Sequence, residues 1–320
     1  MPPSATPAAA PALAPESVAE PGAEPAARRL SVGFLGTGIM GGHMARRIAQ
    51  AGHDVAAWNR TAAKAEALSA FGVAQASDAA AAARGADAVV CMLSSGPVCD
   101  ETLLAGGVLD AMRPGSLLVV MSSIPVAAAR RHAEAAAERG IGCLDAPVSG
   151  GETGARDGTL AIMAGGTQEA FERARPLLEA MGRPTHVGPA GTGQLSKLVN
   201  QMIVASTIAT VAEAVLLAER GGADPAKVRE ALLGGFADST ILRQHALRMI
   251  GRDFRPGGPA KYQVKDTTTA VEFGRTVGLE LPVLAVVDRL FGDMVAHGDG
   301  DLDHSAVVRE IGRRNGLGIA

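Results

Sequence analysis

The sequence predicts an α/β fold in which an N-terminal doubly wound domain is followed by an all-α domain, with a long helix joining the two. From Arg29 onward, short apolar runs alternate with helical stretches, which is typical of a parallel sheet with helices on both faces. A glycine-rich turn, Gly36 to Gly41, follows the first of these runs. After Gly191 the strand-like runs stop, and only helical patterns follow.

The first half of the chain contains the apolar runs that predict buried strands. We expect these strands at 30–35, 54–58, 88–93, 117–121, 143–145 and 160–164, with a last edge strand at 184–187. Helices are expected at 39–51, 62–70 and 126–139, the last of which is closed by Gly140. The alternation predicts a parallel, doubly wound sheet.

The second half begins with a helix, expected at 195–220, that contains no glycine or proline. It is apolar around nearly its whole circumference, so we expect it to be buried on all sides, between the domains and a partner subunit. Lys197, Asn200 and Glu213 would make it a costly membrane span. Further helices are expected at 225–233, 240–250, 262–277, 282–297 and 304–314.

Length and composition divide the chain into three parts. With 320 residues and 47% hydrophobic content, it can bury more than one core. We expect a disordered Ala/Pro-rich tail over 1–28, a nucleotide-binding domain over 29–191, and an all-α substrate and oligomerisation domain over 192–320. The tail lacks the basic start of a signal peptide, and it contains glutamates, which transit peptides rarely carry.

Charge and side-chain chemistry argue against several function classes. The net charge of −3 gives no electrostatic footprint for binding nucleic acid or an anionic membrane. Three cysteines without metal-type spacing indicate reduced structural thiols and a cytoplasmic location. The seven histidines are isolated in the sequence, with no i, i+4 pair beside an acid, so we expect no metal site.

The turn Gly36-Thr37-Gly38-Ile39-Met40-Gly41 leaves the first expected strand and opens the first helix. In the dinucleotide-binding fingerprint of Rossmann domains, the first glycine permits a tight turn and the second lets the backbone approach the pyrophosphate. The third lets helix and strand pack closely. The helix N-terminus, at Ile39 and Met40, then offers unpaired N–H groups to the phosphates. The sequence therefore predicts a dinucleotide site at this turn.

The end of the second expected strand indicates which dinucleotide is preferred. An NAD site normally places an acidic residue there for the ribose hydroxyls, but this chain has Asn59-Arg60-Thr61. Arg60 can pair with a 2′-phosphate, and Asn59 and Thr61 can hydrogen-bond to it. We therefore expect NADP(H) to be preferred, with NAD(H) also accepted. The alternative is that Arg60 begins the next helix on a solvated surface.

Two further segments carry polar groups suited to a small carboxylate substrate. Lys197 and Asn200 are three residues apart on the long helix, so the ammonium and the amide share one face and can converge on one oxygen. The loop Ser149-Gly150-Gly151 follows a strand, and its hydroxyl and exposed amides suit capture of a carboxylate. From the residues alone, an ordinary wide turn explains this loop equally well.

These motifs together resemble the β-hydroxyacid dehydrogenases, relatives of 3-hydroxyisobutyrate dehydrogenase. The resemblance covers 31 to about 314 and rests on Gly33 to Gly41, Asp145 to Gly151, Gly193 to Asn200, and Lys265-Asp266. Within the family, the chain is most similar to the tartronate semialdehyde reductase branch, through Lys197 to Gln201 and the stretch 222–237.

The resemblance implies a role for each site residue. Lys197 would be the general acid that protonates the carbonyl oxygen during reduction, and the base in the reverse direction. Ser123 would lie near the nicotinamide and the substrate, and Leu93 and Lys265 would contact the cofactor. The substrate would be held by Ser149, Gly150, Gly151 and Asn200. Gly258 stands where the family usually has a phenylalanine near the cleft, which predicts a reshaped pocket.

The resulting expectation is a cytoplasmic NADP(H)-dependent reductase of a short 3-oxo acid or semialdehyde, active as a homodimer or homotetramer. Imine reductases share the fold but usually have another residue at the position of Lys197. Succinic semialdehyde and glyoxylate reductases on the same fold are alternatives. A non-catalytic NADP-binding module is a third, and it would bind the cofactor without turning over any short hydroxy acid.

Overall fold

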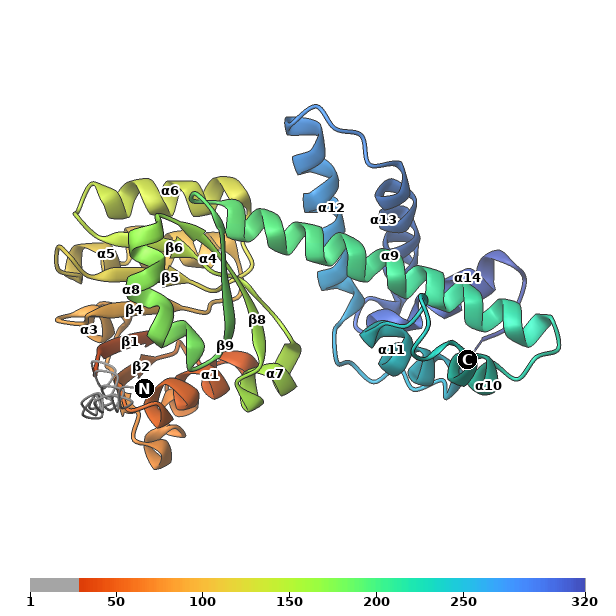
Figure 1. The fold of residues 1–320 in the computed structure, drawn as a ribbon, viewed down its shortest axis with the longest axis horizontal. Helices are drawn as coiled ribbons and strands as arrows, with labels where there is room; N and C mark the ends of the chain where they lie inside the picture. The colour runs from red at the N-terminus through yellow and green to blue at the C-terminus, as the bar shows by residue number, and fades with distance from the viewer. Residues whose placement is uncertain (1–28, 320) are drawn as a thin grey trace, which may run out of the picture.

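Figure 1 shows the computed structural model, which describes residues 29–319. A sheet domain and a helical domain lie side by side, and one long helix runs from the first into the second (Figure 1). The α/β fold class expected from the sequence is confirmed. The expected tail, 1–28, lies outside the described residues.

The sheet domain is built on a nine-stranded sheet. Its strands are β1 (Ser31–Leu35), β2 (Asp54–Trp58), β3 (Ala74–Gln75), β4 (Ala88–Cys91), β5 (Leu117–Val120), β6 (Gly142–Asp145), β7 (Val148–Ser149), β8 (Leu160–Gly166) and β9 (Gly182–Gly188). The order is β3-β2-β1-β4-β5-β6-β8-β7, with β9 on β8. β1 to β6 run parallel, and the order reverses between β1 and β4. Doubly wound sheets bind ligands outside the carboxyl ends of the strands at such a switch point.

Helices cover this sheet (Figure 1). They are α1 (Ile39–Gln50), α2 (Ala62–Glu66), α3 (Ala79–Ala83), α4 (Gly96–Asp100), α5 (Val108–Ala111), α6 (Val126–Ala137), α7 (Gly151–Asp157) and α8 (Gln168–Glu179). The helix expected at 62–70 ends at Glu66, and a 3₁₀ turn, Ser69–Phe71, follows it. Gly72, with a left-handed φ of 78°, then turns the chain toward β3. Helices as short as α3 and α5 show no clear period in the sequence, which is why they are not predicted.

The far end of the sheet differs from the expected parallel arrangement. β8 pairs antiparallel with both β6 and β7. After β6 the chain forms β7 and then α7, which packs against α1 (Figure 1). A parallel return needs a connection that crosses the sheet, and this short excursion does not provide one.

The helical domain is organised around α9 (Thr192–Arg220). It also contains α10 (Pro225–Leu232), α11 (Thr240–Ile250), α12 (Ala260–Thr276), α13 (Pro282–Met294) and α14 (Val307–Arg314). By length and composition alone, α9 could cross a membrane. Instead, its residues Ala205, Ile208, Ala212 and Leu216 lie in the core of this domain, among side chains of the other helices. The helices expected at 282–297 and 304–314 include irregular turns, Val295–Asp299 and His304–Ala306.

Part of α9 is exposed within one chain. The sequence led us to expect that this helix is buried on all sides, with a partner subunit covering part of it. Val199, Ile203 and Leu217 are 45%, 57% and 75% exposed. Each is a large apolar side chain on the longest helix of the described residues. Burial on every side would therefore require a surface from outside this chain.

Candidate active site

The glycine turn between β1 and α1 has the geometry of a phosphate-binding loop. Gly36 has a φ of +100°, and a Cβ on it would lie 2.3 Å from the carbonyl oxygen of Met92. A Cβ on Gly41 would lie 2.0 Å from the carbonyl oxygen of Gly36, so helix and strand meet too closely for a side chain. A Cβ on Gly38 would have no described heavy atom within 4 Å apart from the neighbouring residues of the chain and of the helix backbone. This leaves open space at the N-terminus of α1. The turn therefore packs tightly on one side and leaves room on the other.

Unused polar groups at this turn fit a dinucleotide. Gly38, the N-cap of α1, has no side chain to cap the first N–H groups of the helix, which begins at Ile39 and Met40. Ile39 is exposed, and Met40 is half-buried. Within the described residues, the hydroxyl of Thr37 is buried without a hydrogen-bond partner. A pyrophosphate would supply acceptors for these donors.

A pocket of about 420 Å³ lies beside the glycine turn, where the adenosine end of a dinucleotide would be bound. It is lined by Trp58, Asn59, Arg60, Ala62, Ala65, Gln75, Ala76 and Ser77. Asn59 Oδ1 accepts a 3.0 Å hydrogen bond from the N–H of Thr37, and its Nδ2 donates one of 3.0 Å to the carbonyl oxygen of Thr61. Asn59 therefore ties the glycine turn to the start of α2. Arg60 is exposed, and its guanidinium is the cationic group on the pocket wall.

The loops after β4 and β5 meet at the same edge of the sheet. The N–H of Leu93 donates a 2.7 Å hydrogen bond to Ser122 Oγ. The Leu93 side chain lies against Gly36, because a Cβ there would be 2.9 Å from Leu93 Cδ2. Ser123, next in the chain, is half-buried. Leu93 and the Ser122-Ser123 segment thus border the glycine turn.

The start of α9 is joined to this edge by buried hydrogen bonds. Asp145, at the end of β6, accepts 2.7 Å hydrogen bonds from the N–H groups of Gly191 and Gln194. Gln194 Nε2 donates a 2.8 Å hydrogen bond to the carbonyl oxygen of Ser122, and its Oε1 accepts one of 3.0 Å from the N–H of Ile124. Lys197 follows Gln194 by three residues, so it lies about one helical turn from this junction.

Lys197 is half-buried, and its environment changes its proton affinity. Burial lowers the pKa of its amine, the negative charge of Asp266 raises it, and the positive charge of Lys265 lowers it, with a net decrease. Asp266 is itself buried, and its Oδ1 lies 3.1 Å from Lys265 Nζ. The amine therefore releases a proton more readily than an exposed lysine does, which is the property a general acid needs near neutral pH.

Asn200 and Lys265 are engaged with neighbouring side chains in this structure. Asn200 Nδ2 donates a 2.8 Å hydrogen bond to Gln201 Oε1, and Gln201 Nε2 donates one of 2.8 Å to Asp266 Oδ2. Lys265 is exposed, on α12, in its ion pair with Asp266. The polar face of α9 predicted from the spacing of Lys197 and Asn200 thus continues through Gln201 to α12.

The segment Ser149-Gly150-Gly151 is not a wide loop. Ser149 ends β7 and is half-buried, and α7 begins at Gly151. Gly150 and Gly151 are exposed and have φ angles of +140° and +62°, a region that strains other residues. The glycines therefore make a sharp strand-to-helix turn.

Four polar residues of this region were not assigned a role by the sequence motifs alone: Asp145, Gln194, Gln201 and Asp266. Asp145 and Asp266 lie within quoted motifs, yet the hydrogen bonds that connect them to Gly191, Gln194 and Gln201 span 46 to 65 residues. A signal was present in Gln194 and Gln201, because amides on an apolar helix need hydrogen-bond partners where packing shields them from water.

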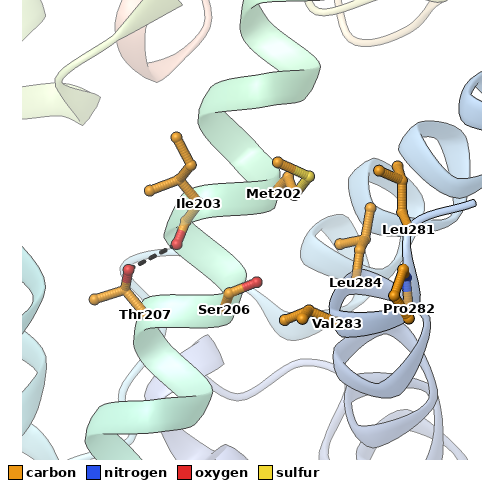
Figure 2. A pocket seen from close by; sticks show the side chains of 8 residues that line it. All are labelled: Met202, Ile203, Ser206, Thr207, Leu281, Pro282, Val283 and Leu284. Carbon is orange, nitrogen blue, oxygen red and sulfur yellow. Dashed lines mark hydrogen bonds between the residues drawn. The ribbon is translucent and has the colours of Figure 1, made fainter. Parts of the chain in front are cut away.

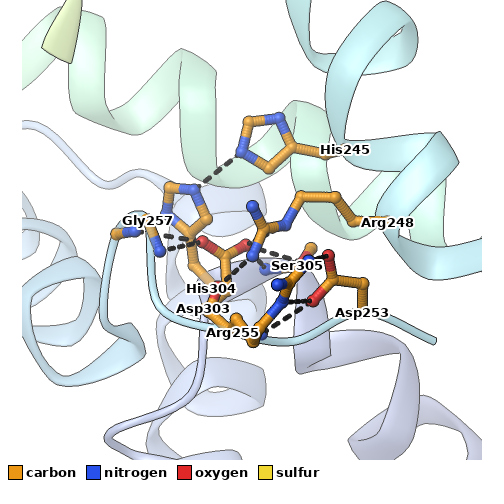
Figure 3. A network of polar contacts seen from close by, with 9 residues as sticks. His245, Arg248, Asp253, Arg255, Gly257, Asp303, His304 and Ser305 are labelled. Carbon is orange, nitrogen blue, oxygen red and sulfur yellow. Dashed lines mark hydrogen bonds and ion pairs between the residues drawn. The ribbon is translucent and has the colours of Figure 1, made fainter. Parts of the chain in front are cut away.

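The positions of the histidines in the sequence suggested that they are isolated, but two of them lie close together in the structure. His245 on α11 and His304 approach with their Nε2 atoms 2.8 Å apart, beside Asp303 (Figure 3). Asp303 Oδ2 accepts hydrogen bonds from the N–H groups of Gly257 and Gly258, and Oδ1 accepts two from Ser305. These four donors occupy the lone pairs of the carboxylate, which suits a structural junction better than a metal ligand.

Gly258 lies against the cluster of His245, Asp303 and His304. A Cβ there would be 3.1 Å from Cε1 of the His304 ring. The space next to Gly258 is thus filled by the imidazole of His304, and a phenylalanine at this position would require the ring to move. The reshaping expected from this substitution therefore involves the packing of His304.

Comparisons with known proteins agree with this geometry. The NAD-binding domain of 6-phosphogluconate dehydrogenase matches residues 31–191, and the NAD-binding domain of NADP-dependent 3-hydroxyisobutyrate dehydrogenase matches residues 191–311. The 2-hydroxy-3-oxopropionate reductase of Escherichia coli (strain K12) is 42% identical, over 88% of this chain and 97% of its own. The chloroplastic glyoxylate/succinic semialdehyde reductase 2 of Arabidopsis thaliana is 31% identical, over 88% and 79%.

A solved structure shows the same likeness. The 3-hydroxyisobutyrate dehydrogenase of Mycobacterium tuberculosis, described with L-serine, is 32% identical and superposes with a TM-score of 0.82, over 89% of this chain and 99% of its own. The resemblance predicted from the motifs is confirmed, including the branch, since 2-hydroxy-3-oxopropionate is tartronate semialdehyde. The relatives named here are dehydrogenases and reductases. The chain therefore belongs to the β-hydroxyacid dehydrogenase family of NAD(P)-dependent oxidoreductases.

Proposed function

We propose that the protein is an NADPH-dependent reductase that converts a short 3-oxo acid or semialdehyde, of the 2-hydroxy-3-oxopropionate type, to the hydroxy acid. The observation that carries the proposal is the half-buried amine of Lys197, whose pKa is lowered chiefly by burial. It lies on the helix that the hydrogen bonds of Asp145 and Gln194 join to the edge of the glycine turn. A proton donor and a dinucleotide site thus share one edge of the sheet.

The residues of this site can carry out the protein's part of a carbonyl reduction. When bound, NADPH supplies the hydride that reduces the carbonyl carbon. Lys197 Nζ–H donates its proton to the carbonyl oxygen as negative charge develops there. The lowered pKa of Lys197 favours this donation, and the negative charge of Asp266 opposes part of the decrease by favouring the protonated amine. In the reverse direction the neutral amine accepts the hydroxyl proton.

A carboxylate on the substrate would be held by groups around Ser149. The hydroxyl of Ser149 and the amides of Gly150 and Gly151 offer donors. The two glycines, which have positive φ angles, carry no side chains that would block the approach of a carboxylate. Asn200 would contact the substrate hydroxyl. The Mycobacterium tuberculosis relative is described with L-serine, a 3-hydroxy acid that carries a carboxylate, which supports this class of substrate.

NADP(H) is the preferred cofactor in this proposal, and NAD(H) is a weaker one. Support comes from Arg60, a cation on the wall of the adenosine pocket, where an NAD enzyme would normally have an acid. Asn59 already accepts from the N–H of Thr37 and donates one N–H to the carbonyl oxygen of Thr61, which leaves the second N–H of its amide for the 2′-phosphate. Arg60, the charged group of the two, would provide most of the discrimination for the 2′-phosphate.

A substrate panel tests the proposal. Purified protein would be given 2-hydroxy-3-oxopropionate, methylmalonate semialdehyde, succinic semialdehyde and glyoxylate, each with NADPH and with NADH, and followed at the nicotinamide absorbance. We expect the highest kcat/KM for a 3-oxo acid with NADPH. A preference for succinic semialdehyde or glyoxylate would place the chain with the Arabidopsis reductase instead. NADPH binding without turnover of any substrate, a cyclic imine included, would indicate a non-catalytic module.

The protein is further proposed to work as a homodimer or homotetramer, in which a second copy covers α9. An apolar groove with a volume of about 390 Å³ lies between α9 and the start of α13, and Figure 2 shows the side chains that line it. It is lined by Met202, Ile203, Ser206, Thr207, Leu281, Pro282, Val283 and Leu284. Of these, Ile203 and Val283 are the exposed large apolar side chains, and covering such a side chain contributes up to roughly 1.5–3 kcal/mol, which favours association. A cytoplasmic location stays a prediction from the sequence.

A further inference from the structure

We propose that Asp145 is a positioning residue for the reaction: its carboxylate fixes the first turn of α9, and with it Lys197, against the loop that carries Ser123. This inference rests on the proposed role of Lys197 as proton donor. Asp145 itself does not contact the reacting atoms. It acts through the backbone of another domain, from the end of β6.

The carboxylate replaces a missing helix cap. The N-cap of α9 is Gly191, which has no side chain with which to bind the free N–H groups of the first turn. Asp145 Oδ1 accepts from the N–H of Gly191 and Oδ2 from that of Gln194, both at 2.7 Å. A negative charge at a helix N-terminus is also favoured by the helix dipole. Both oxygens are thus committed to α9.

Two glycines allow the helix to come this close. A Cβ on Gly193 would lie 2.2 Å from the carbonyl oxygen of Asp145 and 2.4 Å from that of Met163. A Cβ on Gly165, on β8, would lie 2.6 Å from the N–H nitrogen of Gly193. The first turn of α9 therefore rests directly on the backbones of β6 and β8. A shift of the helix would break both the contact and the hydrogen bonds.

Gln194 extends the same junction to the substrate side. Its side chain bonds to the carbonyl oxygen of Ser122 and to the N–H of Ile124, the residues on either side of Ser123. Gln194 is 1% exposed, so water does not compete for these bonds. Asp145 holds the backbone of Gln194, and Gln194 holds the backbone around Ser123. The spacing between Ser123 and Lys197 is thereby set by one connected set of hydrogen bonds.

The junction is also sensitive to proton binding. Asp145 is 3% exposed, and burial raises the pKa of its carboxyl to about 6, while hydrogen bonds from the backbone N–H groups of Gly191 and Gln194 oppose that rise. The titratable neighbour on the same strand is the thiol of Cys143, whose own pKa is raised to about 12 and which stays neutral. Below about pH 6, one oxygen of Asp145 carries a proton and accepts less well from α9. Carbonyl reduction should then slow on the acid side, although Lys197 is still protonated there.

The test compares wild type with Asp145→Asn and Gln194→Met, using Asp110→Asn on an exposed site of α5 as the matched control. Asp145→Asn keeps the shape of the side chain but places its NH₂ group against the N–H of Gly191 or of Gln194, so that two donors face each other. Because misplacement by about 1 Å can cost on the order of 10²-fold, we expect kcat for reduction to fall about 10- to 100-fold. The NADPH Kd should change less than about twofold, and the inflection near pH 6 should vanish. Gln194→Met should lower kcat but keep that inflection.

Hydrogen exchange provides a readout that does not depend on turnover. In Asp145→Asn, amides 191–195 should exchange faster than in wild type, while those of the glycine turn should not change. Unchanged exchange there, or wild-type kcat with the inflection retained, would overturn the positioning role. Bound NADPH with unchanged affinity shows that a variant is folded. If Lys197→Ala keeps full activity, the proton-donor role fails separately, and the exchange result still decides whether Asp145 holds α9.

Discussion

Gln201 Nε2 on α9 donates a 2.8 Å hydrogen bond to Oδ2 of Asp266 on α12, although the two residues are 65 positions apart in the sequence. The same carboxylate pairs with Lys265 and raises the pKa of Lys197 against the effect of burial. Asp266 therefore links the helix that carries the proposed acid to the helix proposed to contact the cofactor. The charge state of Lys197 depends on both helices being in place.

Replacing Lys197 with alanine should reduce turnover by about 10²–10⁴-fold, the usual contribution of a general acid. The NADPH Kd should stay close to that of wild type, because the glycine turn and the Arg60 pocket are formed by other elements. Steady-state kinetics and fluorescence titration would measure the two quantities, with Lys227→Ala on the exposed face of α10 as control. Near-normal turnover in Lys197→Ala would falsify its role.

The pH dependence of the two directions should be opposite. Reduction needs the protonated amine, so its kcat should fall as pH rises through the lowered pKa of Lys197, and kcat for oxidation should rise over the same range. Asp266→Asn removes the charge that raises this pKa, so both transitions should move to lower pH. Rate profiles in both directions would show this. Transitions that stay at the same pH would mean that Asp266 does not act on Lys197 electrostatically.

Arg60→Ala should weaken NADPH binding by ~1.5–3 kcal/mol, which is typical of a hydrogen bond to a charged group. NADH has no 2′-phosphate, so its affinity should barely change. Isothermal titration of both cofactors would measure the difference, and Lys64→Ala on the neighbouring α2 serves as control. Equal binding of NADPH and NADH by wild type would refute the interpretation of Arg60.

Ser149→Ala should raise KM for acid substrates and leave the NADPH Kd unchanged, because the hydroxyl is proposed to bind the substrate carboxylate. The effect should be absent with an uncharged aldehyde of similar size, which makes that aldehyde an internal control. Initial rates over a range of substrate concentrations would separate KM from kcat. An unchanged KM for acids would remove Ser149 from the substrate site.

Ile203→Glu should dissociate the proposed oligomer, because Ile203 is 57% exposed in one chain and lines the groove of Figure 2. Ile208 on the same helix is unsuitable, since it is fully buried within a single chain and a charge there would unfold the monomer. Light scattering at micromolar concentration would report the change, with Phe71→Glu on the sheet domain as control. A monomeric, active wild type would contradict the oligomer.

The elements that the sequence predicted well are those with a strong local pattern. β2 and α11 have the expected bounds, and the glycine turn lies between β1 and α1, because apolar periodicity and glycine spacing are local properties. β7 and α7 were missed because they are short, and β8 was expected as a strand but not with its antiparallel direction, since pairing direction depends on the path of the connection. A two-residue strand has no period of its own.

The same distinction applies to the site. Lys197 was found because a lysine in an apolar helix is locally unusual, and Gly36 because its neighbours form a motif. Asp145 and the pair His245–His304 gain their meaning from partners 46 to 59 residues away. Such contacts exist only after the strands and helices have packed, so the order of residues in the chain does not reveal them.

The continuity of α9 restricts how this protein can diverge. Its 29 residues carry Lys197 near one end and the core residues Ala205 and Ile208 further along. Each helical residue adds roughly 100° of rotation and about 1.5 Å of rise, so deleting one residue between Lys197 and Ala205 would turn the amine to another side of the helix. The 233–239 connection, in contrast, is exposed over 234–237, and surface connections of this kind tolerate insertions. Substitutions on the exposed face of α9 should therefore disturb the site less than an insertion or deletion, which would turn Lys197 relative to the core residues.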